Sequence, residues 1–141
     1  MIILDTNVIS ELAKPRPDPA VLRWADGQAL ERLYATAISE AEILYGLNLL
    51  LVGTRREALH RAVLTVFGGL FAGRVLPFDS AAAEEYGAWA GERRRAGRPT
   101  GMGDLQIAAI ARARGAHAIV TRNTRDFDGC GVELIDPWLP L

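Results

Sequence analysis

Short, unbroken apolar runs alternate along the chain with longer stretches in which apolar residues recur every three or four positions. The short runs predict buried β-strands, because a strand covered on both faces carries no alternating polar positions. We expect strands at 1–5 (MIILD), 33–37 (LYATA), 74–78 (RVLPF), 117–121 (HAIVT) and 132–135 (VELI).

The longer stretches predict helices, and glycine or proline marks several of their ends. We expect helices at 6–13, 20–26, 39–50, 54–70, 79–95 and 104–114. Pro19 suits the first turn of the second helix, and Asp79 or Ser80 can cap the fifth. Apolar residues from Leu59 to Leu70 form one broad stripe along the fourth helix. The last helix is apolar on most sides, which indicates that it is buried.

Strands that alternate with helices favour a parallel sheet with helices on both faces. We therefore expect one α/β domain over residues 1–141, a three-layer α/β/α fold with a doubly wound parallel sheet of about five strands. The helices at 39–50 and 54–70 are an inserted pair between the second and third strands. In such a fold the carboxyl ends of the strands and the amino ends of the helices share one edge, where ligands bind.

The amino-acid composition excludes several kinds of catalytic and metal site. The single cysteine, Cys130, excludes a disulfide within the chain and a cysteine cluster. Only two histidines are present, His60 and His117, far apart in sequence, so zinc sites and histidine triads are not expected. The net charge is −1, so phosphate binding needs a local basic patch. No apolar run is long enough to span a bilayer and the amino-terminal residues lack a signal-peptide pattern, so we expect a cytoplasmic protein.

Acidic residues fall where the predicted fold brings strand ends and helix starts together. Asp5 ends the first strand, Glu42 lies near the start of the helix at 39–50, and Asp104 opens the buried helix. Each has a simpler interpretation: Asp5, Asp79 and Asp104 are good helix caps, and Ser39 with Glu42 matches a capping box. Capping does not explain Gly103, which precedes Asp104 and suits close approach of another group.

Convergence of these carboxylates would be costly without a cation. Two like charges ~4 Å apart repel by about 4 kcal/mol at an effective dielectric of ~20, and three such pairs approach the whole stability of a domain. Either some carboxylates stay protonated or a cation lies between them. Oxygen ligands alone favour Mg²⁺ or Mn²⁺, and such an ion commonly completes its shell with water and phosphate oxygens, which favours a phosphoester substrate.

Four segments resemble the PIN-domain ribonucleases in order and spacing, and specifically the VapC-type toxins of bacterial toxin–antitoxin pairs, with the FitB-related subgroup the most similar. They are "ILDTNVISEL", "ISEAEILYG", "GMGDLQIAAIARARGA" and "IVTRNTRDF", and "PW" near the carboxyl terminus also fits. The resemblance spans essentially the whole chain. It implies a PIN-like fold and a metal-dependent endoribonuclease that hydrolyses RNA phosphodiester bonds.

The resemblance also assigns residues. Asp5, Glu42 and Asp104 match the family's catalytic carboxylates, which hold one or two divalent ions. The residues matching positions that orient these carboxylates are Thr6, Asn7 and Ser39. The family often has a fourth acidic residue where this chain has Asn123. Asn123 and Asp126, which is three residues further around the turn, are therefore the candidates for a fourth ligand. We therefore expect one strong ion site.

RNA must be held beside this acidic site despite the net negative charge. Arg122 lies on the active edge and Arg125 nearby, and four arginines precede the Asp104 loop: Arg93, Arg94, Arg95 and Arg98. Arginine binds phosphate through two parallel hydrogen bonds. The alternative for Arg93, Arg94 and their neighbour Arg95 is a solvated helix end.

Partners are also implied. The leucine-rich segment 44–53 is either a helix pair buried in the monomer or a homodimer seam, and the resemblance favours the dimer and a small antitoxin that covers the active groove and contacts DNA. Three other functions are alternatives: a catalytically weak or dead PIN scaffold that binds RNA, a receiver-type phosphoacceptor domain, and a dinucleotide binder. The receiver type needs a late lysine, and Lys14 is the only lysine; the dinucleotide binder needs a glycine-rich loop after the first strand.

Overall fold

A computed structural model describes residues 1–140 and contains one sheet of five parallel strands. The strands are β1 (Ile2–Leu4), β2 (Leu33–Thr36), β3 (Val75–Leu76), β4 (Ala118–Val120) and β5 (Glu133–Ile135). Their order in the sheet is β3-β2-β1-β4-β5. Each lies inside a predicted run, so the parallel sheet is confirmed, with shorter strands than the apolar runs that predicted them.

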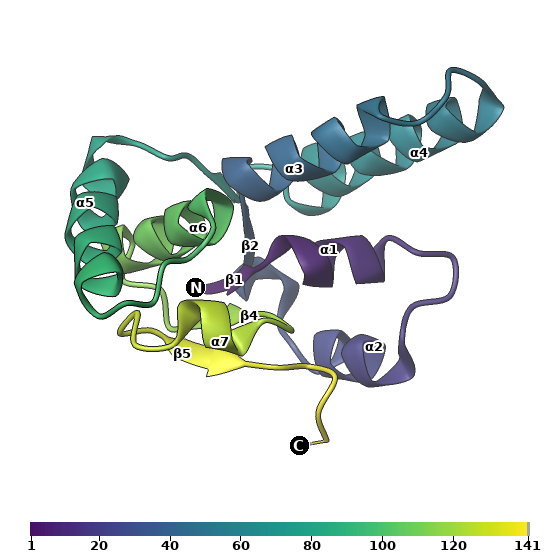
Figure 1. The fold of residues 1–141 in the computed structure, drawn as a ribbon. Coiled ribbons are helices and arrows are strands. Elements are labelled where there is room, and N and C mark those ends of the chain that lie inside the picture. The colour runs from purple at the N-terminus through teal and green to yellow at the C-terminus, as the bar shows by residue number, and fades with distance from the viewer. Residues whose placement is uncertain (141) are drawn as a thin grey trace.

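Helices cover both faces of the sheet, as the three-layer prediction requires (Figure 1). They are α1 (Thr6–Leu12), α2 (Pro19–Asp26), α3 (Ala37–Asn48), α4 (Thr54–Thr65), α5 (Ser80–Arg95), α6 (Met102–Ala113) and α7 (Thr124–Phe127), with a 3-10 turn, η1 (Leu30–Arg32), and a π-helical turn, η2 (Val66–Leu70). None of the helices among residues 1–140 has the length and apolar character that crossing a bilayer requires.

Strand β1 shows why the fold has two cores. Ile2 and Leu4 point into one apolar cluster, with residues of α1, α2 and η2. Ile3 points the other way, into a second cluster built mainly from α5 and α6. All three are buried, and successive side chains of a strand face opposite sides of a sheet. The unbroken apolar run therefore reflects a strand enclosed on both faces.

The α3–α4 pair lies between β2 and β3 in the chain, as predicted, and forms a hairpin that extends beyond the sheet (Figure 1). The helix predicted at 54–70 is interrupted: α4 ends at Thr65 and the chain continues as the π-helical turn η2. Phe67 of the predicted stripe is buried, and Val63 and Val66 pack against the core, while Leu59 and Leu70 are exposed. The stripe thus serves the core only in part.

Two expected helix starts are wrong. Helix α3 begins at Ala37, and its cap is Thr36, whose hydroxyl accepts from the Ser39 backbone N–H. Ser39 and Glu42 therefore do not form a capping box. Helix α6 begins at Met102 after Gly101, so Asp104 lies in its first turn and is not its cap. Both corrections free the acidic side chains from a capping role.

Candidate active site

The carboxylate site lies where the chain order of the sheet reverses. Strand β1 is central and pairs with β2 on one side and β4 on the other. The segments that leave the carboxyl ends of β1 and β4 turn apart, which opens a crevice at this edge of a doubly wound sheet. Asp5 directly follows β1 and Thr121 directly follows β4, so both stand in that crevice.

Asp5 is held rigidly in this position. Its side chain is 2% exposed, and it accepts hydrogen bonds from the Thr6 N–H at 2.7 Å, the Asn7 amide at 3.0 Å and the Thr121 hydroxyl at 2.7 Å. Burial raises the pKa of Asp5, and these three hydrogen bonds partly oppose the rise. Asp5 does cap α1, but the contacts with Asn7 and Thr121 show that it has further partners.

Glu42 and Asp104 approach the same place from α3 and α6. Glu42 lies against Gly103: a methyl group added there would collide with the Glu42 carboxylate oxygen Oε1. The prediction that Gly103 permits close approach of another group is therefore confirmed. Burial raises the pKa of Glu42, a hydrogen bond with Thr6 lowers it, and the charge of Asp5 raises it.

Asp126, one of the two candidates for a fourth ligand, acts on Asp104. Helix α7 was not predicted; it begins after Asn123 and has Asp126 in its first turn. Burial, the charges of Asp5, Asp126 and Glu42, and a hydrogen bond with Asp126 together raise the pKa of Asp104 to about 7. The charges of Asp5, Glu42 and Asp126 therefore all act on Asp104.

The predicted orienting residues surround the cluster. The Thr6 hydroxyl donates to Ser39 Oγ at 2.9 Å, and Ser39 is fully buried. Asn7 donates to Asp5 and to Thr121 Oγ1 and accepts from the Arg122 backbone N–H. Asn123 is exposed. Its backbone N–H donates to Thr121 Oγ1, while its side chain does not cap α7.

Sequence comparison places this arrangement in a known family. The PIN domain family model matches residues 2–130. The chain belongs to the PIN domain family. It is 43% identical over 140 residues to the VapC ribonuclease Y4jK of Sinorhizobium fredii, covering 99% of each chain, and 38% identical to toxin FitB of Neisseria gonorrhoeae, covering 98% of this chain and 99% of that one.

Structural comparison agrees. The structure of FitAB bound to the IR36 DNA fragment matches this PIN domain with a TM-score of 0.91 at 38% identity, covering 100% of this chain and 98% of that one. The predicted three-layer fold and the predicted family are thus both confirmed. A receiver-type phosphoacceptor domain and a dinucleotide binder are not supported.

The PIN-domain carboxylates offer only oxygen donors, which suit a hard divalent ion. Asp5, Glu42, Asp104 and Asp126 come from four different elements. Within residues 1–140, no three acidic, histidine or cysteine side chains already have the arrangement of a metal site. The oxygen donors nevertheless fit a hard ion. Burial and neighbouring negative charge raise the pKa values of three of the four carboxylates, so a cation bound among them would relieve their repulsion.

An arginine-rich cavity adjoins the carboxylates. It has a volume of about 440 Å³. Its walls come from the end of α5, the loop after it and the start of α7: Arg93, Arg98, Arg122, Asn123, Thr124, Arg125 and Asp126. Because Asp126 belongs both to this cavity and to the carboxylate cluster, a phosphate held by the arginines would lie next to the cluster. Arg94 is exposed and does not line the cavity.

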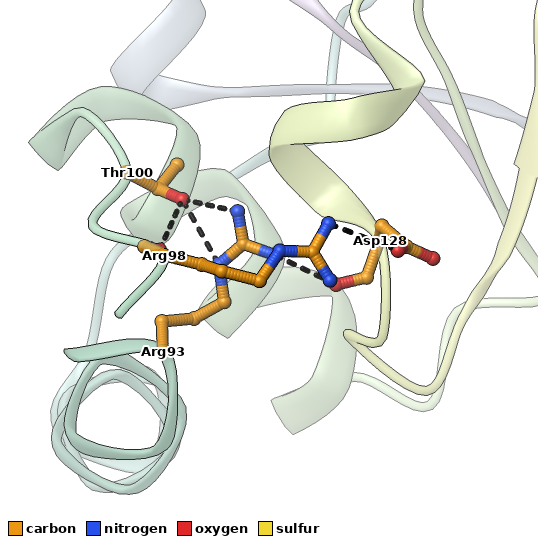
Figure 2. A network of polar contacts seen from close by, with 4 residues as sticks. All are labelled: Arg93, Arg98, Thr100 and Asp128. Carbon is orange, nitrogen blue, oxygen red and sulfur yellow. Dashed lines mark hydrogen bonds and ion pairs between the residues drawn. The ribbon is translucent and has the colours of Figure 1, made fainter. Parts of the chain in front are cut away.

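Arg93 has an internal role that its place at a helix end did not indicate. It is buried and donates to Thr100 Oγ1 and to the Asp128 carbonyl oxygen (Figure 2). Arg98 pairs with the Asp128 carboxylate at 3.1 Å. These contacts fasten the loop before α6 to the end of α7, and so set Asp104 and Asp126 relative to each other. Because its guanidinium is occupied by these internal hydrogen bonds, Arg93 does not belong to an RNA-binding surface.

Proposed function

We propose that this PIN domain is a metal-dependent endoribonuclease and the toxin of a toxin–antitoxin pair. The observation that carries the proposal is the gathering of four carboxylates beside an arginine-lined cavity. A site for a divalent ion next to a site for phosphate is the arrangement that phosphodiester hydrolysis requires. The similarity to a VapC ribonuclease supports RNA as the substrate.

Asp5 and Asp104 are the proposed direct ligands of Mg²⁺, for which Mn²⁺ substitutes, with Glu42 as a ligand or as the group that orients its water. Asp126 replaces Asn123 as the proposed fourth ligand, because its charge acts on both Asp5 and Asp104. When bound, the ion activates water and offsets charge that develops on the phosphate.

The protein's own residues set the conditions for this chemistry. Asn7, Thr6 and Thr121 fix the Asp5 carboxylate, so one ligand is already oriented. Asp104, with a pKa of about 7, must lose its proton before it binds a cation. Ion affinity and activity should then rise with pH through neutrality. Neither His60 nor His117 lies among the residues of the cluster, which leaves proton transfer to water and the carboxylates.

Substrate RNA is proposed to run through the arginine cavity. Arg98, Arg122 and Arg125 line it; Arg122 and Arg125 follow β4 directly, at the active edge. Guanidinium groups bind phosphate oxygens through parallel N–H donors. A local patch of this kind is necessary because the net charge of the chain is −1.

The proposed partners are a second copy of the chain and a small antitoxin. The hairpin of α3 and α4 exposes large apolar side chains that no element of residues 1–140 covers: Tyr45, Leu49, Leu51, Val52 and Leu64. Leu51 is 91% exposed and Val52 85%, which favours a homodimer seam. The FitAB relative was solved on DNA; we propose that DNA contact here is indirect, through the antitoxin, in a cytoplasmic complex.

A cleavage assay tests the proposal. Purified protein is incubated with mixed single-stranded RNAs in Mg²⁺, Mn²⁺ or EDTA, beside Asp5→Asn, Asp104→Asn and the control Asp26→Asn, an exposed aspartate of α2. We expect cleavage with either ion, none in EDTA, a loss of more than about 100-fold in the two site variants, and no loss in the control. Undiminished cleavage in EDTA would exclude a metal-dependent mechanism; folded protein without cleavage would favour the RNA-binding scaffold.

A further inference from the structure

The carboxyl-terminal turn contacts the arginine cavity through one aromatic side chain. The guanidinium carbon of Arg122 lies 5.1 Å from the centre of the Trp138 ring. Arg122 lines the cavity proposed to hold RNA, and Trp138 belongs to the "PW" pair, which fits the family resemblance but lies outside the carboxylate site. The role of this pair therefore needs a separate explanation.

Trp138 is a fixed platform. Its indole packs against the buried cluster that includes Val8 and Ile9, and its backbone N–H donates to the Asp136 carboxylate at 2.9 Å, which closes the turn. Pro137, directly before it, is buried. The ring thus has little freedom to move, and the Arg122 guanidinium lies over it.

Arg122 is held at two points. The Trp138 ring lies against its guanidinium, and its backbone N–H donates to Asn7 Oδ1 at 3.3 Å. Asn7 also holds Asp5, so the arginine and the first carboxylate share one support.

We propose that Trp138 is a positioning residue for RNA binding, which holds the Arg122 guanidinium by its face so that its N–H edge is presented to a phosphate in the cavity. This inference rests on the proposed function. A guanidinium stacked on an indole keeps its in-plane donors available, and the stacked arginine loses less rotational freedom when phosphate binds. Without the ring, Arg122 must be ordered by the substrate.

Two substitutions distinguish the effect of the aromatic face of Trp138 from the effect of its apolar packing. Trp138→Phe keeps an aromatic face, whereas Trp138→Leu keeps apolar packing but removes the aromatic face. We expect Trp138→Leu to raise KM about 3- to 10-fold with kcat within about two-fold, and Trp138→Phe to stay within about two-fold of wild type. In an Arg122→Ala background, Trp138→Leu should have no further effect. Leu139→Ala, in the same turn and 62% exposed, is the matched control and should change nothing.

Binding is measured in parallel, by anisotropy of a fluorescein-labelled single-stranded RNA ten-mer with Asp104→Asn protein that carries each substitution. This arm does not need cleavage: if the wild type cleaves no RNA, the proposed function fails while the binding arm still tests Trp138. Weaker binding in Trp138→Leu alone supports the proposal. Equal KM and affinity in the Leu and Phe variants, additive losses in the Arg122→Ala background, or a lower kcat with unchanged KM would overturn it.

Discussion

Asp104→Asn should stabilise the ion-free protein, although it removes a proposed catalytic group. In the folded chain the carboxyl of Asp104 has a pKa of about 7 against an ordinary value of 3.8, because burial and the neighbouring carboxylates disfavour its charge. An unfolded chain has no such crowding. The amide of asparagine has nearly the same shape and no charge, so the substitution removes the repulsion and keeps the packing.

The magnitude follows from the difference between the pKa of Asp104 in the folded chain and its ordinary value. This difference corresponds to roughly 4 kcal/mol of unfolding free energy at pH 8, where the group is ionised in both states. Asp104 is only half-buried, and solvent screening reduces the figure to about 2 kcal/mol. For a chain of this size that is a rise of roughly 5–10 °C in Tm.

The sign depends on pH. Between about pH 4 and pH 7 the folded wild type binds more protons at Asp104 than the unfolded chain does, so its stability falls as pH rises through this window. Asp104→Asn lacks this contribution. The Tm advantage of the variant should therefore be largest at pH 8, about half as large near pH 5.5, and small at pH 4, where the folded carboxyl is protonated and the unfolded one is close to its ordinary pKa of 3.8.

Thermal unfolding in EDTA, followed by circular dichroism from pH 4 to pH 8, measures the effect, with Asp26→Asn as the control. Adding Mn²⁺ at pH 8 should raise the Tm of the wild type and have little effect on Asp104→Asn, because a ligand that binds only the folded state stabilises it. A lower Tm for Asp104→Asn than for wild type at pH 8 in EDTA would show that the carboxylates do not repel one another, and the reasoning would be refuted.

Three other predictions concern single contacts. Gly103→Ala should displace the Glu42 carboxylate and reduce kcat by about 10-fold or more, while Tm changes little because only a side-chain end must move. Thr121→Val removes a 2.7 Å hydrogen bond to Asp5; we expect a loss of about 1–2 kcal/mol in denaturant unfolding and a shift of the acidic limb of the pH–rate profile to higher pH. Arg125→Ala should raise KM by about 10-fold and reduce the salt dependence of RNA binding.

Each contact has a matched control in the same kind of position. Gly101→Ala, where an added methyl group meets nothing within 4 Å, should leave kcat unchanged; a similar loss in both glycine variants would contradict the role given to Glu42. Thr65→Val removes a hydroxyl that bonds only within its own helix and should not move the pH profile. Arg94→Ala lies outside the cavity, so an equal rise in KM there would indicate a diffuse basic surface.

The sheet and the central carboxylates could be predicted because local signals determine them. Unbroken apolar runs identify strands enclosed on both faces. Asp5 follows such a strand and Asp104 opens the helix that leads to another, so the parallel topology alone brings them to one edge. Gly103 was also informative, since a missing side chain beside an acidic residue indicates close approach. These inferences depend on chain order and not on the details of side-chain packing.

Asp126 and Arg93 could not be placed by the same reasoning. A helix of four residues, such as α7, has too few positions to show a period, so nothing local indicates that Asp126 turns back toward Asp104. Arg93 occupies the last turn of α5, where arginine is usually solvated; its burial depends on the loop at 96–101 folding back so that Thr100 can accept its hydrogen bonds. Both depend on tertiary contacts between distant segments.

The most direct test of the central claim is a crystal structure grown with Mn²⁺ and examined by anomalous diffraction at the manganese absorption edge. The account predicts one strong anomalous peak bounded by the carboxylates of Asp5 and Asp104, with Asp126 or Glu42 as a further ligand. Carboxylates that remain apart, with no manganese between them at saturating ion concentration, would contradict it.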